Sequence, residues 1–345
     1  MPAFKAKRAR FRKTVLDRRD QTLGTGDLRR EVFSVNPLPP FRLDLSVWAL
    51  RRRQANAVDL WDGKSYQRTL GFIDGAAAIS VSQASSPESP QLAVAVVSGR
   101  VGRSFGESVI ASLERMLGLR VDLSGFYQMA AADSLLGPLV ARFWGLKPPR
   151  FPTVFEGLLN AVANQQLSLE SGLSLLNRLA AVHGKTATTG RTSLHAFPGP
   201  QELAELEPQA LVDLGFSGRK AATIIEISRS VVAGQLDLES LDRVDDDEVI
   251  ARLTRLRGIG RWSAEYVLLR GLGRLHVFPG DDVGARNNLA PWLGLEPPLD
   301  YDAVKQALAR WQPYAGMIYF HLLLARLEAM GKLDTEHASL VAAED

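Results

Sequence analysis

Two adjacent carboxylates are the residues whose type and placement could do chemistry most directly. Asp281 and Asp282 follow Phe278-Pro279-Gly280 and stand just before a helical pattern that begins at Val283. One of them could cap that helix by accepting backbone N–H groups, and for the pair in isolation this structural role is favoured. A carboxylate in a loop can also stabilise a positively charged transition state or orient a water molecule. Both interpretations stay open at this point.

A glycine-rich turn lies upstream of the acids. Gly258-Ile259-Gly260 separates two helical patterns, and Arg261 opens the second one. The glycines permit the φ values that a tight turn needs, and they leave the backbone exposed. Ile259 would plug between the two helices, while free N–H groups at the start of the second helix could hold a DNA phosphate without reading its sequence. An ordinary αα-hairpin is the alternative.

The turn and the acids together, at their spacing, resemble the helix-hairpin-helix Gly/Pro–Asp superfamily of DNA glycosylases. More narrowly, the sequence is similar to the AlkA-like 3-methyladenine DNA glycosylase II branch of that superfamily. The resemblance covers roughly residues 40–330. Other segments that carry it are Pro148-Pro149-Arg150-Phe151-Pro152, Phe155-Glu156-Gly157-Leu158-Leu159, Asn164-Gln165-Gln166-Leu167-Ser168, Leu214-Gly215-Phe216-Ser217-Gly218-Arg219-Lys220-Ala221, and Trp311-Gln312-Pro313-Tyr314 through to His321.

The resemblance implies an activity and a catalytic residue. The expected activity is hydrolytic release of alkylated purines, of the 3-methyladenine and 7-methylguanine type, from duplex DNA, which leaves an abasic site. Asp282 matches the family's catalytic aspartate, and Asp281 is the weaker candidate, a helix cap or a supporting residue. Some relatives use a lysine on the second hairpin helix to form a Schiff base. Trp262 stands at that position here, so we expect no AP-lyase activity.

Two further sites follow from the resemblance. Trp262 and Tyr266 lie four positions apart on one helix face and are expected to stack on a flipped base, with core packing as the alternative. An indole facing a cationic purine would add cation–π attraction. Gln166 occupies the position of the side chain that fills the gap left in the DNA stack, with Leu167 beside it. The alternative is that Gln165 and Gln166 tie helix ends together.

The closing helix departs from the family's best-known pattern. Where it could supply another aromatic to the pocket, this chain has Leu322-Leu323, and Tyr319 and Phe320 come a turn earlier. The range of damaged bases therefore stays open. His321, on the same helix, is more often a packing residue than a proton carrier.

Composition bounds the cofactors. The chain has no cysteine, which excludes disulfides, thiolate zinc sites and the iron–sulfur cluster of some relatives. Its five histidines are scattered without metal-ligand spacing. We therefore expect no metal held by side chains and no cofactor. A structural monovalent cation at the hairpin turn, held by backbone carbonyls and phosphate, is compatible with the sequence.

Charge and hydropathy bound the partners. The net charge is +3, but Lys and Arg residues crowd positions 5–13 and 51–53, which suits a DNA backbone or a solubilising tail. No apolar run is long enough to span a membrane, and no apolar stretch follows the basic start as in a signal peptide. We expect a monomeric, cytoplasmic, nucleoid-associated protein whose partner is damaged double-stranded DNA.

These residues need elements to position them. We predict a mostly α fold, with two helical subdomains of the helix-hairpin-helix glycosylase type preceded by a small α+β antiparallel-sheet domain. The expected divisions are a basic, disordered tail over 1–36, the α+β domain over 37–120, the helical domains over 121–333 with the hairpin at about 249–270, and a frayed tail over 334–345. The local patterns predict a strand at Phe41–Leu45, a helix at Leu45–Arg53, strands at Tyr66–Phe72, Ala76–Ser82 and Gln91–Ser98, and a polar loop at Thr186–Pro200.

Three other functions remain alternatives. A non-catalytic DNA-binding module could keep the hairpin for phosphate binding. The same fold could cut an oxidised or deaminated purine. A transcription regulator fused to this fold is the weakest, because no regulatory domain is visible in the sequence.

Overall fold

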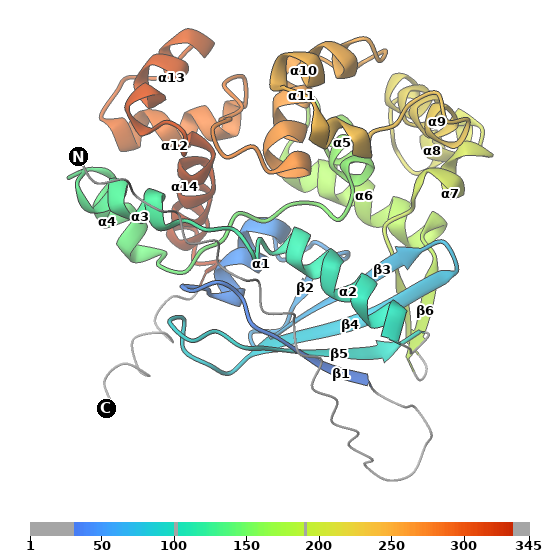
Figure 1. The fold of residues 1–345 in the computed structure, drawn as a ribbon. Coiled ribbons are helices and arrows are strands. Elements are labelled where there is room, and N and C mark those ends of the chain that lie inside the picture. Colours follow the sequence, from blue (N-terminus) through green and yellow to red (C-terminus); the bar gives the residue numbers. More distant parts are fainter. Residues whose placement is uncertain (1–30, 100–102, 190–191, 334–345) are drawn as a thin grey trace, which may run out of the picture.

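A five-stranded antiparallel sheet forms one end of the molecule (Figure 1). The computed structural model describes residues 31–99, 103–189 and 192–333. The strands follow the order β1-β5-β4-β3-β2 across the sheet. Their bounds are β1 (Glu31–Val35), β2 (Leu60–Trp61), β3 (Ser65–Phe72), β4 (Gly75–Gln83) and β5 (Leu92–Ser98).

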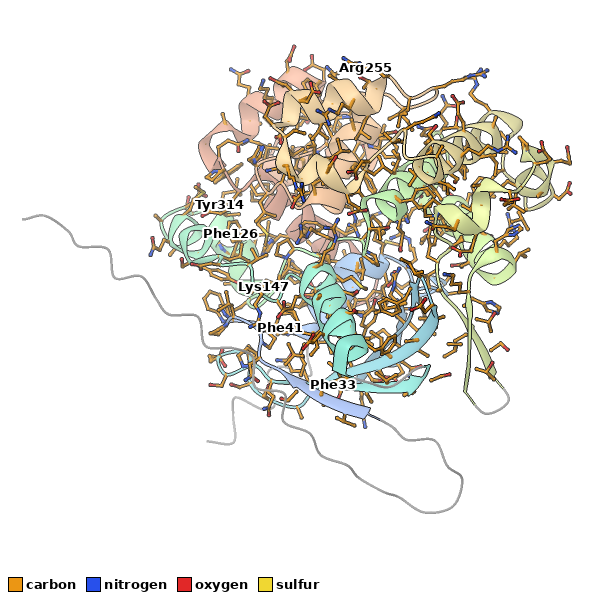
Figure 2. The ribbon with its side chains drawn as sticks, turned by 45° about the vertical axis from the view of Figure 1, so that its right-hand side comes forward. Phe33, Phe41, Phe126, Lys147, Arg255 and Tyr314 are labelled. Atoms are coloured by element: carbon orange, nitrogen blue, oxygen red, sulfur yellow. The ribbon has the colours of Figure 1, made fainter. Side chains whose placement is uncertain are left out.

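Two helices cover the sheet. Residues of α1 (Leu43–Arg51) and α2 (Arg103–Met116) share one hydrophobic core with the inward side chains of the strands. Phe33 of β1 packs on α2, where a Cβ added at Gly106 would come within 2.6 Å of the ring (Figure 2). A glycine there therefore allows the helix to lie directly on the edge strand.

Most of the described chain after α2 is helical and packs around two further cores. One core joins residues of α5, α6, α9, α10 and α11, and the other joins residues of α1, α3, α4, α12, α13 and α14. The bounds are α3 (Ser124–Ala131), α4 (Leu136–Arg142), α5 (Val154–Asn164), α6 (Leu169–His183), α7 (Pro200–Ala204), α8 (Pro208–Asp213), α9 (Gly218–Val232), α10 (Asp246–Thr254), α11 (Arg261–Val267), α12 (Val283–Leu293), α13 (Tyr301–Leu308) and α14 (Ala315–Ala329). A π-helical turn, Leu268–Leu272, extends α11.

A buried ionic network joins the sheet to α5. Arg68 of β3 donates to Asp59 at 2.6 Å and to both carboxylate oxygens of Glu156 at 2.6 Å. The hydroxyl of Tyr66 donates to Asp59 at 2.7 Å. Burial raises the pKa of Glu156 in spite of the facing guanidinium. Removing one member would leave a buried charge unpaired, at a cost of about 3–5 kcal/mol, so the network holds the two parts in one orientation.

The predicted disordered tail over 1–36 extends too far toward the C-terminus. Glu31–Val35, assigned from sequence to the disordered tail, forms strand β1 and pairs antiparallel with β5. Phe33 and Val35 are buried by that pairing, which joins segments far apart in the sequence. The predicted tails over 1–30 and 334–345, with the basic cluster at 5–13, lie outside the described residues.

Two local predictions were wrong. The alternation over Phe41–Leu45 is not a strand, because Leu43 already begins helix α1. Nearly all of that helix is buried, so its apolar residues do not follow a one-sided helical spacing. The polar loop predicted over Thr186–Pro200 contains a hairpin of β6 (Thr186–Thr189) and β7 (Thr192–His195), which lies against β4 and β5. Its β-branched threonines suit strand geometry once a neighbouring edge is present.

Candidate active site

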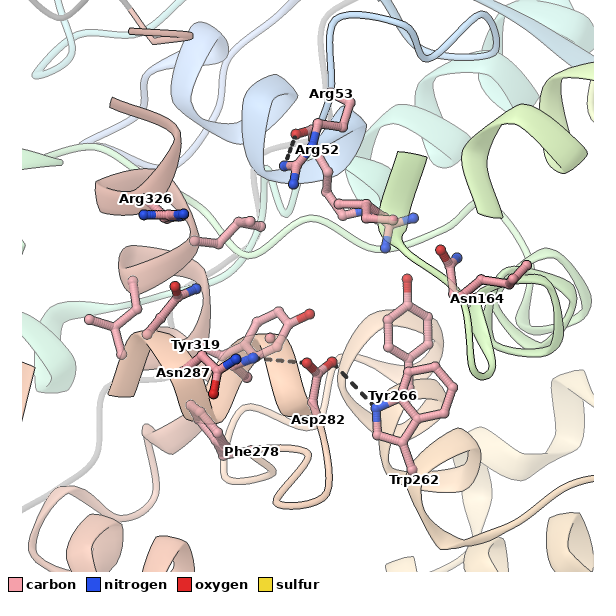
Figure 3. A pocket seen from close by; sticks show the side chains of 17 residues that line it. Arg52, Arg53, Asn164, Trp262, Tyr266, Phe278, Asp282, Asn287, Tyr319 and Arg326 are labelled. Carbon is pink, nitrogen blue, oxygen red and sulfur yellow. Dashed lines mark hydrogen bonds between the residues drawn. The ribbon is translucent and has the colours of Figure 1, made fainter. Parts of the chain in front are cut away.

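A pocket of about 460 Å³ opens between the two helical cores (Figure 3). This size is typical of small-molecule sites. Five parts of the chain supply its lining: the end of α1, the α5–α6 loop, α11, the loop before α12 together with α12 itself, and α14. The lining residues include Arg52, Arg53, Asn164, Leu167, Trp262, Tyr266, Phe278, Asp282, Tyr319, Leu322, Leu323 and Arg326.

Asp282 caps a helix and also faces this pocket. Its Oδ1 accepts the backbone N–H of Ala285 at 2.8 Å, as an N-cap of α12 does, and its Oδ2 accepts the indole N–H of Trp262 at 3.3 Å. The helix N-terminus and both donors stabilise the negative charge of the carboxylate. The two interpretations left open by the sequence are therefore compatible, because different oxygens serve the cap and the pocket side.

The loop that carries Asp282 is fastened to α11. Glu265, which is 4% exposed, accepts the backbone N–H of Gly280 at 3.1 Å and the hydroxyl of Tyr301 at 2.7 Å. Burial raises the pKa of Glu265. Sequence reasoning missed this residue, since a lone glutamate in an amphipathic helix predicts a solvated side chain.

The adjacent acid has a different partner. Arg261 donates to Oδ2 of Asp281 from Nε at 3.0 Å and from Nη2 at 2.9 Å, and its guanidinium stacks 3.8 Å from the ring centre of Tyr301. Asp281 does not line the pocket. Arg261 is predicted to contact phosphate, but in the structure its side chain binds Asp281, next to Asp282. The Arg261–Asp281 pair connects the hairpin to the loop that carries Asp282.

Aromatic rings form two walls beside Asp282. Trp262 and Tyr266 lie 5.6 Å apart between ring centres, at 37°, on one wall. Phe278 and Tyr319 form the other, 5.7 Å apart at 79°. Burial raises the pKa of Tyr319, and the negative charge of Asp282 raises it to a smaller extent. The sequence placed the first pair in the pocket, whereas Tyr319 was noticed only as an aromatic a turn away from the expected position.

The hairpin has the predicted local geometry. Gly258 has φ +83, and a Cβ there would meet Oγ1 of Thr223 at 2.7 Å. Gly260 is extended, and a Cβ there would meet nothing within 4 Å, so its backbone borders open space before α11. Ile259 is 5% exposed and packs in the core between α10 and α11, as expected.

Gln165 and Gln166 of the α5–α6 loop have different surroundings. The side chain of Gln165 donates to the carbonyl of Gly258 at 2.9 Å and to Oγ of Ser263 at 3.0 Å, which ties the loop to the hairpin. Gln166 is exposed and has φ 55, in the left-handed region that side chains rarely adopt. Leu167 is 45% exposed and lines the pocket.

Comparisons with known proteins agree with this architecture. The family model described as HhH-GPD superfamily base excision DNA repair protein matches residues 159–313, and the AlkA N-terminal domain matches residues 33–152. A DNA-3-methyladenine glycosylase of Bacillus subtilis is 30% identical over 63% of this chain and 71% of its own length. The chain belongs to the HhH-GPD superfamily. The predicted family and fold class are thereby confirmed.

Solved members of the HhH-GPD superfamily share the fold. The 3-methyladenine DNA-glycosylase from Archaeoglobus fulgidus is 25% identical, with a TM-score of 0.74 over 88% of this chain and all of its own. The 3-methyladenine DNA glycosylase Mag1 of Schizosaccharomyces pombe, solved in complex with abasic DNA, is 26% identical, with a TM-score of 0.50 over 60% of this chain and 96% of its own.

The described part of this chain places no lysine amine in the pocket and offers no cluster of metal ligands. Lys220 of α9 donates to the carbonyls of Ala163 and Gln165, and no lysine belongs to the pocket lining among the described residues. In the same part of the chain, no group of three or more histidines or acidic residues could hold a metal ion, and no helix could span a membrane.

Proposed function

We propose that this chain is a monofunctional DNA N-glycosylase that flips an alkylated purine out of duplex DNA and hydrolyses the bond between base and deoxyribose. The observation that carries the proposal is the Asp282 carboxylate, which faces a pocket between two aromatic walls and takes a hydrogen bond from one of them. The relatives named as 3-methyladenine glycosylases support 3-methyladenine as a substrate, and we extend the proposal to 7-methylguanine because it is an alkylated purine of the same positive charge.

The proposed reaction uses a carboxylate and a water molecule rather than a nucleophilic amine. The C1′–N bond breaks and its electron pair leaves with the base, which neutralises the positive charge of an alkylated purine. The sugar becomes an oxocarbenium ion, which the negative charge of Asp282 stabilises. A water molecule then bonds to C1′ and gives up a proton to Asp282 or to solvent. The products are a free base and an abasic site.

The aromatic walls would hold the flipped base. The half-buried Trp262 would offer a stacking surface on one side, with Tyr266, 1% exposed, packed behind it, and Phe278 and Tyr319 border the other side. Bases are commonly held between aromatic faces after flipping. A cationic purine gains additional attraction from an indole face.

The hairpin and the α5–α6 loop would hold the DNA. The bare backbone at Gly260 leaves the start of α11 open to a phosphate oxygen, and no side chain caps that end. Arg255, at the end of α10, is exposed nearby (Figure 2). The exposed side chain of Gln166, with Leu167 beside it, would enter the gap that the flipped base leaves. A monovalent cation at the hairpin turn stays compatible with this arrangement.

The absence of strand cleavage rests on the lining of the pocket. A Schiff base needs an uncharged amine within reach of C1′. Trp262 occupies the family's lysine position, and Lys220 is engaged with two carbonyls at the end of α5. The described lining therefore offers no amine to the sugar.

The test is an incision assay on duplex DNA that carries alkylated purines. Purified protein should release free 3-methyladenine and 7-methylguanine, and the strand should break only after alkali treatment. Release of neither base would overturn the glycosylase proposal. Strand breaks without alkali would overturn its monofunctional part.

A further inference from the structure

Two arginines that follow α1, Arg52 and Arg53, line the base pocket, and Arg52 is the more deeply buried of the two. Arg52 follows helix α1, lines the pocket and is 5% exposed. Its guanidinium carbon lies 6.0 Å from the centre of the Tyr266 ring, and the side chain points toward Tyr266 and Asn164 (Figure 3). The N-terminal domain thus contributes a charged group to a wall that otherwise belongs to the helical domains.

The local structure gives Arg52 no ordinary structural role. Its backbone has φ 61 and ψ −27, at a helix C-cap where glycine is strongly preferred. No carboxylate pairs with it in the described part of the chain, and its Nε–H is buried without an acceptor. A buried arginine normally has its charge paired, and Arg52 lacks such a partner among the described residues.

Asn160 holds the guanidinium in position. Its Oδ1 accepts from Nη2 of Arg52 at 3.2 Å, and its Nδ2 donates to the carbonyl of Glu156 one turn earlier at 3.1 Å. The carbonyl of Glu156 belongs to helix α5, so this hydrogen bond keeps the amide oxygen of Asn160 directed at Arg52.

We propose that Arg52 is a specificity-determining residue of the base pocket and that Asn160 is its positioning residue. A guanidinium only donates hydrogen bonds. Guanine presents an acceptor, O6, at the 6-position, and 7-methylguanine keeps it although methylation removes the N7 acceptor, whereas adenine presents a donor, its 6-amino group, at that position. Arg52 would accordingly favour 6-oxo purines, the alkylated guanines, over 6-amino purines, the alkylated adenines. This inference rests on the proposed glycosylase function.

Charge by itself does not produce this preference. Nucleotides of 7-methylguanine and of 3-methyladenine both carry a positive charge, so a guanidinium repels both to a similar extent. The ratio of their release rates therefore isolates the hydrogen bond to the 6-position. Because both bases leave in the same reaction, partial loss of folded enzyme also cancels in the ratio.

The experiment measures both released bases from one methylated duplex. The ratio of 7-methylguanine to 3-methyladenine release, relative to the wild-type ratio, should fall at least about fivefold in R52M. The release ratio of R52K should lie between those of wild type and R52M, because an ammonium group donates hydrogen bonds but lacks the planar geometry of a guanidinium. N160A should shift the ratio in the same direction. R120M, an exposed arginine of the sheet domain paired with Glu114, is the matched control and should keep the wild-type ratio.

An unchanged ratio in R52M, or a proportional loss of both rates, would overturn the inference. If wild-type protein releases neither base, the glycosylase proposal has failed, and equilibrium dialysis with the free bases then tests Arg52 separately. A preference for free 7-methylguanine over free 3-methyladenine that is lost in R52M supports the inference. Equal or absent binding overturns it.

Discussion

The indole Nε1 of Trp262 donates a 3.3 Å hydrogen bond to Oδ2 of Asp282, so the aromatic wall and the carboxylate form one unit. Trp262 is the second residue of α11, directly after the hairpin turn. The element proposed to hold the phosphate therefore also supplies the group that orients the proposed catalytic oxygen. A shift of the hairpin on DNA would move both together.

Replacing Asp282 by asparagine separates catalysis from folding. Asparagine is as good an N-cap as aspartate, so α12 and the loop before it should persist. The neutral amide cannot stabilise the oxocarbenium ion, and D282N should lose at least about 3 kcal/mol of transition-state stabilisation, on the order of a hundredfold in rate. Single-turnover base release measures the loss, and anisotropy with an abasic-site duplex should show unchanged DNA binding.

The neighbouring acid is the matched control for that variant. D281N removes the partner of Arg261 but leaves the pocket carboxylate in place. Its rate should fall much less than that of D282N. Normal excision by D282N would mean that Asp282 is only a cap and would favour the non-catalytic DNA-binding alternative.

The hydrogen bond between Trp262 and Asp282 can be removed with the ring retained. W262F keeps an aromatic surface for the base but leaves Oδ2 without its donor, and a hydrogen bond to a charged group contributes about 1.5–3 kcal/mol. The single-turnover rate should fall about tenfold or more, with little change in affinity for the abasic-site duplex. Equal rates for W262F and wild type would show that the indole N–H does not orient the carboxylate.

Replacing Gln166 by glycine distinguishes its two proposed roles, which are to fill the gap in the DNA stack and to tie helix ends together. Its φ of 55 costs a side-chain residue about 1–2 kcal/mol, so Q166G should leave the free energy of unfolding unchanged or raise it by up to about 1 kcal/mol. Excision from duplex DNA should fall in Q166G, whereas excision from a single strand, which has no gap to fill, should not. A clear loss of stability in urea titrations would instead favour the helix-tying role.

His321 should make stability depend on pH. Burial lowers the pKa of this histidine from 6.5 to about 4, and its Nδ1 donates to the carbonyl of Met317. Below pH 6.5 His321 binds a proton in the unfolded chain but stays neutral in the folded one. Its contribution to the free energy of unfolding is therefore fully present above pH 6.5 and is lost as pH falls toward 4, by about 3 kcal/mol in total.

The measurement compares urea unfolding at about pH 7.5 and about pH 5. H321Q, whose amide can still donate to Met317, should lose about 2 kcal/mol less than wild type between the two pH values. Identical pH dependence in both proteins would show that another group controls acid stability. The ring of His321 is 1% exposed beside Phe126 and Phe143, which agrees with the packing role expected from sequence.

Local patterns predicted the long helices well. The sequence predicts helices at Leu169–His183 and Ala315–Ala329, and the structure has the same bounds, because α6 has an apolar face and α14 is apolar on most sides. The sequence also predicts a helix at Thr153–Asn164; α5 begins one residue later, since Thr153 is its N-cap and accepts from the backbone of Glu156. By contrast, β1 pairs with the distant strand β5, and the β6–β7 hairpin lies against β4 and β5, and no local pattern contains that information.

The sequence by itself determined the family, the hairpin with its buried Ile259, and the candidate set of Asp282, Trp262 and Tyr266. These groups lie close together along the chain, and local turns and helix periodicity place them. Only the tertiary structure decided which distant side chains join them. Arg52 and Tyr319 reach the pocket because the sheet domain and α14 pack against α11, and such contacts depend on the shape of the whole core rather than on any short segment.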